Sequence, residues 1–486
     1  MVRILSNVVY VTLTSMSPAT FAAVVVLMAI SVSFAQSADP LRLPAAEARH
    51  VGTRLATTRA ADDTVTYATG FLDRNQSIAF TVERPAGLYR VHIRYRASGS
   101  KGYDLKIDGL IYSGMFPKSP EFTDFDAGLI ELPGGKIDLT IGGGWGHYDI
   151  AGLTLTPATA DAPTPAPAGV LCNPAASPEA RDLFRRLLSG YGQYTLSGVH
   201  EFADVEYVKQ QVGHDVAILS RDLMDYTPSR IEHGSRPGRM TERVIESAKA
   251  GYTVTLCWHW NAPKDLIDKI ETRPDGRTVD KRWYRGFYSE ATTFDFSRAL
   301  ADPNGADYAL LLRDIDAIAV ELKKLQAAHV PVLWRPLHEA EGKWFWWGTR
   351  GPLAYRQLWT LLYDRLTHYH KLDNLIWVYT SAGEVDWYPG DDKVDVIGAD
   401  AYPADNRDPL TGIWSTLRRS FGDRKPLTLS EVGMVPDVDR MRRHGVYWAY
   451  FCTWGGKLGP RGMAYGELRD RLASTAVHGL KPPNGK

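Results

Sequence analysis

The sequence predicts two folded domains, an N-terminal all-β sandwich and a C-terminal (β/α)8 barrel. Residues 41–155 contain short segments in which apolar and polar residues alternate, which is typical of half-buried strands. Residues 171–486 contain apolar runs that alternate with segments of helical periodicity. Residues 156–170 between them are rich in Pro, Ala and Thr, as expected of a linker.

The N-terminal residues 1–35 are predicted to be a signal peptide. Residues 21–34 carry no charge, and Ser33 and Ala35 give the small-x-small pattern that precedes a cleavage site. This apolar run is shorter than the roughly 20 residues that span a bilayer, and no later charge-free stretch of that length is as apolar. We therefore expect cleavage after Ala35 and a secreted, extracellular protein without a membrane partner.

The predicted sandwich is jelly-roll-like and rests on several alternating segments. Turns such as RPAG and LPGG separate them, and no helical pattern intervenes. The apolar residues of these segments are Ile78, Phe80 and Val82; Val91, Ile93 and Tyr95; Leu105 and Ile107; Ile137, Leu139 and Ile141; and Ile150, Leu153 and Leu155.

The predicted barrel rests on eight apolar runs. Segments of helical periodicity lie between them, for example residues 308–325 and 353–366. Near-continuous apolar strands joined by helical crossovers are what a closed parallel barrel requires. The runs are residues 195–200, 216–222, 252–260, 330–339, 374–380, 394–402, 426–433 and 446–454.

The composition excludes several classes of function. The 486 residues include 56 Lys and Arg against 56 Asp and Glu, and like charges form no long block. Such a chain lacks the basic surface that nucleic acid or an anionic membrane requires, so we expect no nucleic-acid partner. The three cysteines are too few for a disulfide framework and fit no CxxC metal pattern.

Polar residues follow the predicted barrel strands, where the active site of such a barrel lies. Two of them are carboxylates, Glu339 after the fourth run and Glu431 after the seventh. Two carboxylates that face each other across a cleft can cleave a glycosidic bond, because one protonates the leaving oxygen while the other attacks or activates water. The strand-end residues are His200, Asp222, His259, His338, Glu339, Thr380, Asp400, Tyr402, Glu431 and Trp454.

The distribution of tryptophan favours a sugar substrate. All but one of the 14 tryptophans follow the linker, and Trp344, Trp346 and Trp347 come directly after Glu339. The flat apolar faces of pyranose rings stack on exposed indole rings. Of these three tryptophans we expect only Trp344 in the cleft, and the other two in the core or in loop packing.

Metal-dependent and serine-dependent hydrolysis are both disfavoured. The strand-end histidines and carboxylates are zinc-ligand types, but the HxH pattern of barrel amidohydrolases is missing from the first run. No GxSxG motif occurs. We therefore expect neither a metal nor another cofactor.

Several strings of the barrel resemble glycoside hydrolase family 26. They are WRPLHEAEGKWFWWG (334–348), YPGDDKVDVIGADAY (388–402), LTLSEVG (427–433), LSGVHE (196–201) and RWYRGFYSEATTFDFSRAL (282–300). That family consists mainly of retaining endo-β-1,4-mannanases on a (β/α)8 barrel. The resemblance implies that Glu339 is the acid/base and Glu431 the nucleophile. It also implies substrate-binding or orienting roles for His259, Trp283, Arg335, His338, Trp344, Asp400, Tyr402 and Trp454.

One departure from the family pattern concerns the acid/base. Ala340 and Glu341 stand where the family more often carries Met-Asn or a similar pair. We expect the extra carboxylate of Glu341 to raise the pKa of Glu339 or to alter a leaving-group subsite.

The N-terminal domain resembles carbohydrate-binding modules of family 35. The strings that carry this resemblance are PAAEA, GLYRVHIRYRA and GGGWGHYDIAGLTL. The resemblance implies two alternatives for Trp145, ligand contact or turn packing. The family commonly holds a calcium ion through a Glu of the first strand and an Asp near the last. Glu47 fits, but Ala151 stands at the Asp position and Asp149 two residues earlier, so we expect no metal.

Taken together, these features predict a secreted, monomeric, two-domain retaining endo-β-mannanase. Its expected partners are β-mannan polysaccharides, namely mannan, glucomannan or galactomannan, and manno-oligosaccharides. Three alternatives stay open. The first is the same chemistry on mixed-linkage β-glucan or β-1,3-xylan, and the second is exo-acting release of mannobiose. The third is a non-catalytic glycan-binding protein, which the presence of both carboxylates disfavours.

Overall fold

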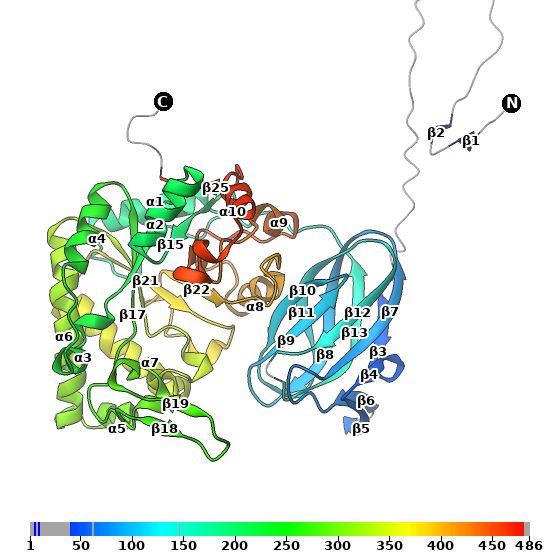
Figure 1. Cartoon of the computed structure of the whole chain (residues 1–486), viewed down its shortest axis with the longest axis horizontal. Helices are drawn as coiled ribbons and strands as arrows, with labels where there is room; N and C mark the ends of the chain where they lie inside the picture. The colour runs from blue at the N-terminus through cyan, green and yellow to red at the C-terminus, as the bar shows by residue number, and fades with distance from the viewer. Residues whose placement is uncertain (1–3, 6–7, 10–38, 61–62, 145, 481–486) are drawn as a thin grey trace, which may run out of the picture.

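The computed structural model describes residues 4–5, 8–9, 39–60, 63–144 and 146–480 (Figure 1). Most of the predicted signal peptide and Trp145 lie outside these residues. Within residues 1–35 only a short pairing of β1 (Ile4–Leu5) with β2 (Val8–Val9) is described.

The N-terminal domain consists of two antiparallel sheets, which confirms the all-β prediction. One sheet has the strand order β10-β9-β12-β7-β4 and the other β11-β8-β13-β6-β5, with β3 paired to β13. The strands are β3 (Leu41–Pro44), β4 (Arg49–Val51), β5 (Arg54–Ala60), β6 (Asp63–Thr69), β7 (Ser77–Arg84), β8 (Gly87–Ala97), β9 (Lys101–Ile107), β10 (Leu110–Phe116), β11 (Ser119–Leu132), β12 (Gly135–Gly142) and β13 (Tyr148–Pro157).

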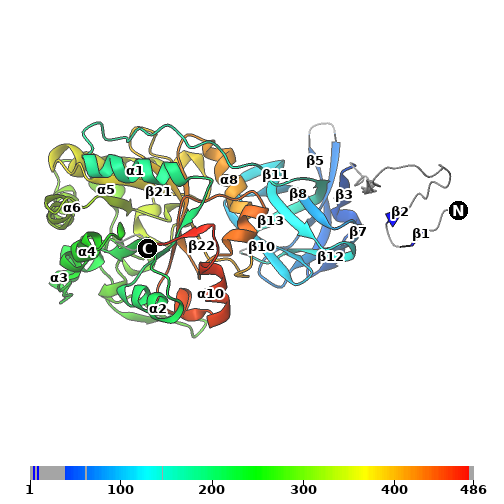
Figure 2. The same cartoon turned by 90° about the horizontal axis from the view of Figure 1, so that it is seen from above.

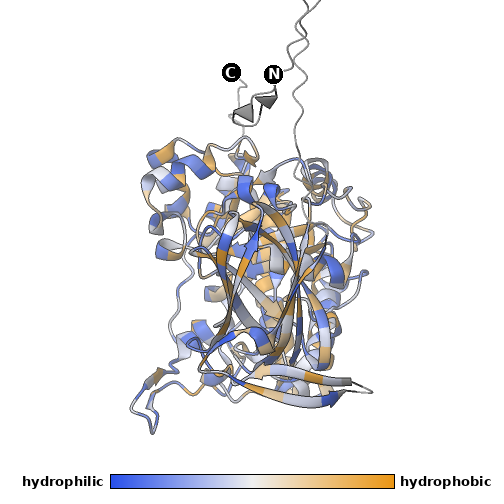
Figure 3. Ribbon diagram, turned by 90° about the vertical axis from the view of Figure 1, so that its right-hand side faces the viewer, coloured by the Kyte–Doolittle hydropathy of each residue, from blue (hydrophilic) through white to orange (hydrophobic). Residues whose placement is uncertain are grey.

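The core of this domain lies between the two sheets. Ile78 and Leu139 from one sheet and Ile93 and Ile150 from the other are fully buried in one cluster. Polar and apolar residues alternate along the strands, as Figure 3 shows for the face toward the viewer. Alternation places every second side chain in the core, which is why the apolar segments of the sequence predicted these strands.

The C-terminal domain is a closed barrel of eight parallel strands, as predicted. Each strand falls inside one of the apolar runs of the sequence. In barrel order the strands are β15 (Gly198–Val199), β16 (Ile218–Asp222), β17 (Thr253–Trp258), β20 (Val332–Pro336), β21 (Leu375–Thr380), β22 (Val396–Ala401), β23 (Leu427–Val432) and β24 (Phe451–Thr453).

Helices surround the barrel (Figures 1 and 2). The longest described one, α6, buries Leu311, Ile315, Ile318, Leu322 and Leu325, a spacing of three and four residues that keeps one face on the strands. The helices are α1 (Pro178–Gly190), α2 (Phe202–Val212), α3 (Pro228–Glu232), α4 (Met240–Lys249), α5 (Phe296–Ala301), α6 (Ala306–Ala327), α7 (Gly351–Tyr363), α8 (Thr411–Phe421), α9 (Val438–Arg443) and α10 (Tyr465–Leu472).

Two small two-stranded sheets complete the barrel domain, one antiparallel and one parallel. The hairpin of β18 (Ile270–Thr272) and β19 (Thr278–Asp280) projects from the loop after β17, and β14 (Thr195–Leu196) pairs with β25 (Val477–His478). Within the described residues, no helix is both long enough and apolar enough to cross a bilayer.

The segment between the domains is fixed to both of them. It contains no helix or strand between the end of β13 at Pro157 and the start of α1 at Pro178. The carboxylate of Asp161 accepts hydrogen bonds from Arg90 of the sandwich at 3.1 Å, and its carbonyl oxygen accepts one from the Tyr447 hydroxyl of the barrel at 3.1 Å. The two domains are therefore joined by side-chain contacts as well as by the chain.

Helix α8 of the barrel packs against β10 and β11 of the sandwich (Figures 1 and 2). The Thr411 hydroxyl donates to the carbonyl oxygen of Leu129 at 2.9 Å. Gly128 lies so close that a Cβ there would fall 2.7 Å from the backbone of Thr411. The sandwich is thus docked tightly on the barrel, and this contact requires glycine at position 128.

We predict that Gly128→Ala destabilises the protein more than Gly135→Ala. Both glycines have a positive φ, of 87° and 79°, but a Cβ at Gly135 would meet nothing within 4 Å. Each alanine therefore costs about 1–2 kcal/mol of backbone strain. Gly128→Ala adds about 1–3 kcal/mol from the clash with α8. Thermal unfolding of the two variants measures the difference, and equal melting temperatures would show that the domain contact is looser than described.

Candidate active site

Glu431 lies at the end of β23 and is held by two donors. Arg335 donates to its Oε2 at 2.6 Å, and the Tyr402 hydroxyl donates to its Oε1 at 2.5 Å. Only 7% of Glu431 is exposed. Burial alone would raise the pKa of Glu431, but the positive charge of Arg335 and the hydrogen bond from Tyr402 outweigh burial and lower this pKa. Glu431 is therefore an anion at neutral pH.

Arg335 ties three barrel strands together through buried charges. It extends from β20 and donates to Asp400 on β22 at 2.8 Å as well as to Glu431 on β23. Asp400 also accepts a hydrogen bond from the Ser430 hydroxyl at 2.9 Å. Burial and the nearby negative charge of Glu431 raise the pKa of Asp400, whereas the positive charge of Arg335 lowers it. The net result is a pKa of about 6, because Arg335 is shared between the two carboxylates.

Glu339 follows β20 in an unusual backbone conformation. Leu337 and Glu339 both have a positive φ, of 49° and 55°, so the chain turns sharply at the strand end. The indole nitrogen of Trp344 donates to Glu339 Oε2 at 2.7 Å. Gly342 allows this contact, because a Cβ there would lie 1.8 Å from the Trp344 ring. The turn and the indole together fix the direction of the carboxyl group.

The protonation state of Glu339 is opposite to that of Glu431. Burial raises the pKa of Glu339 well above its usual value, and the negative charges of Glu431 and Asp400 raise it further. The hydrogen bond from Trp344 and the charge of Arg335 act in the other direction but do not cancel these effects. The site therefore contains one proton-bearing and one ionised carboxyl group.

Two histidines lie beside these carboxylates. His259 Nδ1 is 2.5 Å from the Asp222 carboxylate, so that nitrogen carries a proton, and His259 Nε2 is 3.2 Å from His338 Nε2. Burial, Arg335 and His259 lower the pKa of His338, which is therefore neutral. One hydrogen bond therefore joins the two rings, and the Nδ1 of His338, which is buried, has no hydrogen-bond partner among the described residues.

An aromatic platform borders the same region. Trp454 follows β24 and is partly exposed, and its ring stacks on His200 with 4.2 Å between centroids. His259 lies edge-on to Trp454, with 5.9 Å between the ring centroids. Burial lowers the pKa of His200 to about 4, so its ring stacks as a neutral group.

The other tryptophans singled out in the sequence are placed differently. Trp346 and Trp347 are buried, at 1% and 0% exposure, so they pack in the core as expected, whereas Trp344 is partly exposed. Trp283 stacks on His233 at 5.7 Å and lies under the Arg230 guanidinium. Its described contacts are thus with the α3 segment rather than with the carboxylates.

The expected effect of Glu341 on Glu339 is not what the structure shows. Glu341 points to the loop after β21, where it accepts hydrogen bonds from the Ser381 hydroxyl at 2.5 Å and the Ala382 amide at 2.9 Å. Burial raises the pKa of Glu341 to about 8. It is therefore mostly neutral at pH 7, and the charges that raise the pKa of Glu339 belong to Glu431 and Asp400. The short loop turns Glu341 away from the cleft, which sequence spacing alone does not reveal.

Sequence reasoning missed part of the aromatic surroundings of the site. Phe287 and Phe345 lie edge-on to His259, with centroids 4.9 and 5.4 Å away. Burial, and to a smaller extent the charges of Glu339 and Glu431, raise the pKa of Tyr288, which places this phenol near both carboxylates. Phe287 and Tyr288 belong to the string at 282–300 that carries the family resemblance. That string was the only feature of the sequence that could have placed these two residues at the site.

A group of metal-ligand types occurs in the barrel, but it does not suit a metal. Atoms of Asp222, Cys257 and His259 lie within 4.8 Å of one another, the one such group of three or more among the described residues. The Asp222 carboxylate already accepts a hydrogen bond from His259 Nδ1. Burial raises the pKa of the Cys257 thiol well above its usual value, so a metal would have to displace the thiol proton as well as the hydrogen bond between His259 and Asp222.

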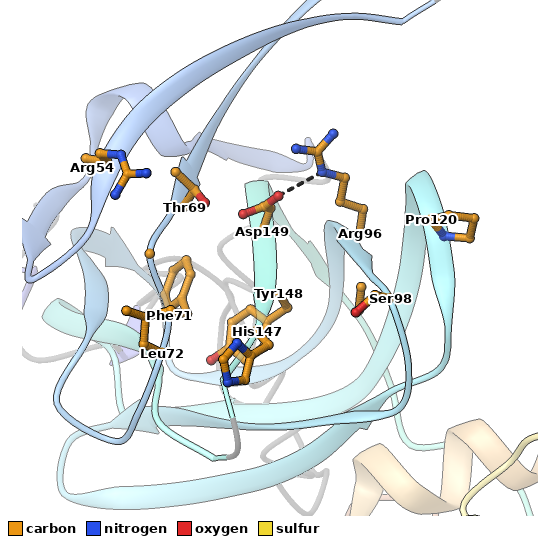
Figure 4. A pocket seen from close by; sticks show the side chains of 12 residues that line it. Arg54, Thr69, Phe71, Leu72, Arg96, Ser98, Pro120, His147, Tyr148 and Asp149 are labelled. Atoms are coloured by element: carbon orange, nitrogen blue, oxygen red, sulfur yellow. Dashed lines mark hydrogen bonds and ion pairs between the residues drawn. The ribbon is translucent and has the colours of Figure 1, made fainter.

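The sandwich domain contains a cavity of about 520 Å³ (Figure 4). Arg54, Phe71 and His147 help to line it, and Arg96 pairs with Asp149 at 2.8 Å on its wall. The calcium ligand of the family is expected at position 151, where Ala151 has no carboxylate. The nearest carboxylate in the sequence, that of Asp149, is already paired with Arg96. These residues therefore do not fit the calcium ion of the family. Trp145 lies outside the described residues.

Comparison with known sequences agrees with this geometry. The sequence model of glycosyl hydrolase family 26 matches residues 172–461, and that of the family 35 carbohydrate binding module matches residues 42–158. A mannan endo-1,4-beta-mannosidase of Thermothelomyces thermophilus is 43% identical over 392 residues, which cover 80% of this chain and 79% of that protein. Mannan endo-1,4-beta-mannosidase B of Piromyces sp. is 31% identical over 408 residues, or 81% of this chain and 68% of that protein.

Two solved structures superpose over most of this chain. The crystal structure of a Podospora anserina GH26-CBM35 beta-(1,4)-mannanase superposes with a TM-score of 0.64 at 39% identity, over 91% of this chain and 98% of that one. A ruminal GH26 endo-beta-1,4-mannanase superposes with a TM-score of 0.62 at 27% identity, over 91% and 97%. The chain therefore belongs to glycosyl hydrolase family 26 and carries a carbohydrate-binding module of family 35 before its barrel.

Proposed function

We propose that the protein hydrolyses internal β-1,4-mannosidic linkages of mannan, glucomannan or galactomannan with retention of configuration. The observation that carries this proposal is the division of charge between two carboxyl groups of one site. Glu431 is ionised beside Arg335, and Glu339 retains its proton. A retaining glycosidase needs this pair, an anionic nucleophile and a protonated acid. The relatives named above support mannan as the substrate.

In the first step Glu431 attacks the anomeric carbon, and the bond to the leaving oxygen breaks as Glu339 transfers its proton to that oxygen. A glycosyl ester on Glu431 and an ionised Glu339 result. In the second step Glu339 takes a proton from water, the water oxygen attacks the anomeric carbon, and Glu431 leaves as a carboxylate. Both carboxyl groups return to their starting states, so the cycle needs no cofactor.

We assign the surrounding residues to substrate binding or positioning by their contacts. Neutral His338 is 1% exposed and its Nε2 lies 3.2 Å from His259 Nε2, so we assign it to holding the His259 ring beside the carboxylates. Trp454, held by stacking on His200, offers an indole face to a pyranose ring. Asp222 orients His259, and Trp344 orients Glu339. The cavity in the sandwich is the proposed glycan contact of the binding module.

The substrate assignment is tested by comparing polymers. We expect release of reducing sugar from galactomannan and glucomannan, and much less from mixed-linkage β-glucan or β-1,3-xylan. A profile of mixed lengths from mannohexaose indicates internal cleavage, whereas mannobiose alone indicates exo action. We further propose that the protein acts outside the cell, on the basis of the charge-free run at residues 21–34 and its cleavage pattern.

We predict that Glu431→Gln lowers kcat on mannan by about three orders of magnitude or more, because the covalent intermediate no longer forms. The variant keeps the size and a hydrogen-bonding oxygen of the side chain, so its circular dichroism spectrum stays unchanged. Proton NMR of the first wild-type product should show the β-anomer. An α-anomer would show inversion and exclude Glu431 as a nucleophile.

For Glu339→Ala we expect a far larger loss of activity on mannan than on an aryl mannoside with an activated phenol, because a good leaving group does not need the acid. Activity depends on protonated Glu339 and falls as the pH rises through its raised pKa, so the basic limb of the pH profile should flatten in this variant. Azide should restore part of the turnover of the activated substrate.

The matched control for this experiment is Glu341→Gln. Glu341 is mostly neutral at pH 7, and the hydroxyls of Ser381 and Tyr379 can exchange donor for acceptor roles, so glutamine fits the same contacts. We expect this variant to retain wild-type activity at pH 7. Equal losses on both substrates in Glu339→Ala, together with an inactive Glu341→Gln, would assign the proton to Glu341 instead.

A further inference from the structure

The binding module contacts the loop that carries Tyr402. This loop, residues 402–410, joins β22 to α8 on the side of the barrel that faces the sandwich (Figures 1 and 2). Its first residue donates to Glu431, and its last residues precede the helix that packs on β10 and β11. The loop therefore connects the proposed nucleophile to the domain interface within nine residues.

Strand β10 is the edge of its sheet, and its outward backbone groups are used by this loop. The amide of Ser113 donates to Asp408 at 2.7 Å, and the amide of Ile111 donates to the Asp405 carboxylate. Arg407 donates to the carbonyl oxygen of Gly109 at 2.7 Å. An edge strand normally leaves such groups to water or to another chain, so their pairing here marks a specific contact.

Asp408 depends on the module for one of its hydrogen bonds. It is 3% exposed, and its carboxylate accepts from the amides of Ser113 and Leu410, the latter at 2.8 Å. Leu410 has a φ of 57°, a strained conformation for leucine that this hydrogen bond helps to hold. A buried carboxylate that loses a donor is destabilised, so the loop and the module are coupled energetically.

Tyr402 has little other support. Nearly half of it, 46%, is exposed, and its ring rests on Gly433, where a Cβ would fall 2.9 Å from the ring. Its hydroxyl nevertheless meets Glu431 at 2.5 Å. A half-exposed side chain on a loop adopts one position only if the loop backbone is fixed. This loop is fixed from two sides, by the module contacts at positions 405, 407 and 408 and by Asn406, which donates to Glu467 of the barrel at 3.0 Å.

We propose that the module acts as a positioning element of the active site, because its edge strand β10 fixes the loop 402–410 and thereby holds Tyr402 against Glu431. The proposal rests on the proposed function, in which Glu431 is the nucleophile. A second contact has the same direction: Ser100 of the module donates to Glu384 on the loop after β21, the loop that also binds Glu341. The module thus contacts the loops of two adjacent strands at the catalytic face.

The test is a double-mutant cycle on soluble mannohexaose, which does not depend on polymer binding. Ser113→Pro removes the outward amide that binds Asp408 and the hydroxyl that accepts from the Ala404 amide of the same loop, and proline is tolerated on an edge strand. Ser113→Thr retains both the amide and the hydroxyl and serves as the matched control. Tyr402→Phe removes the hydroxyl that contacts Glu431. We expect Ser113→Pro to lower kcat about tenfold, the size expected for loss of a hydrogen bond to a charged group, with little change in KM.

Coupling between the two sites distinguishes positioning from general damage. If the module acts through Tyr402, Ser113→Pro should have almost no further effect in the Tyr402→Phe background. Ser113→Thr should stay within about twofold of the wild type. Wild-type kcat in folded Ser113→Pro, or losses that multiply in the double variant, would overturn the proposal.

A second variant covers the case in which Ser113→Pro does not fold. Arg407→Ala removes the exposed guanidinium that binds Gly109, and we expect a smaller loss of kcat that is likewise absent in the Tyr402→Phe background. The same outcomes decide the proposal. If the wild-type protein leaves mannohexaose intact and cleaves another β-glycan, the proposed substrate is wrong, and the cycle is carried out on that glycan.

Discussion

The buried guanidinium of Arg335 is the interaction on which the rest of the site depends. It has 3% exposure and pairs with Asp400 and Glu431, so it fastens β20, β22 and β23 at the end where the barrel opens. A buried charge without a partner is very costly, and arginine remains protonated in proteins. The ion pair with Arg335 therefore keeps Glu431 ionised at neutral pH. That negative charge, together with burial, keeps the proton on Glu339.

The same constraint explains why the neighbouring histidines are neutral. Arg335 is one of the charges that lower the pKa of His338, and His200 is neutral because it is buried against Trp454. Neutral imidazoles can both donate and accept, which suits the hydroxyl groups of a sugar. Arg335 thus supplies a rigid, buried positive charge, while His338 and His200 beside it are uncharged.

The sequence allowed the barrel, the two carboxylates and the partly exposed position of Trp344 to be predicted, because each depends on local periodicity or on the end of an apolar run. The strands β3, β4, β5, β6, β10 and β11 were not predicted; β5, β10 and β11 are edge strands, and an edge strand often lacks a clear apolar alternation. The direction of Glu341 depends on tertiary contacts with Ser381 and Ala382. The Pro-rich linker suggested two separate domains, so nothing in the sequence indicated that Asp408 of the barrel would be buried against the sandwich.

The central claim is that burial and the charge of Glu431 together keep Glu339 protonated, and NMR titration of carboxyl groups in protein labelled with ¹³C-glutamate tests the contribution of Glu431 most directly. The Glu339 resonance is assigned by its loss in Glu339→Gln. In the wild type this resonance should titrate well above the usual range of glutamate, and in Glu431→Gln its pKa should fall, because the nearby negative charge is gone. A Glu339 pKa that is the same in both proteins, or that lies in the usual range in the wild type, would contradict the account.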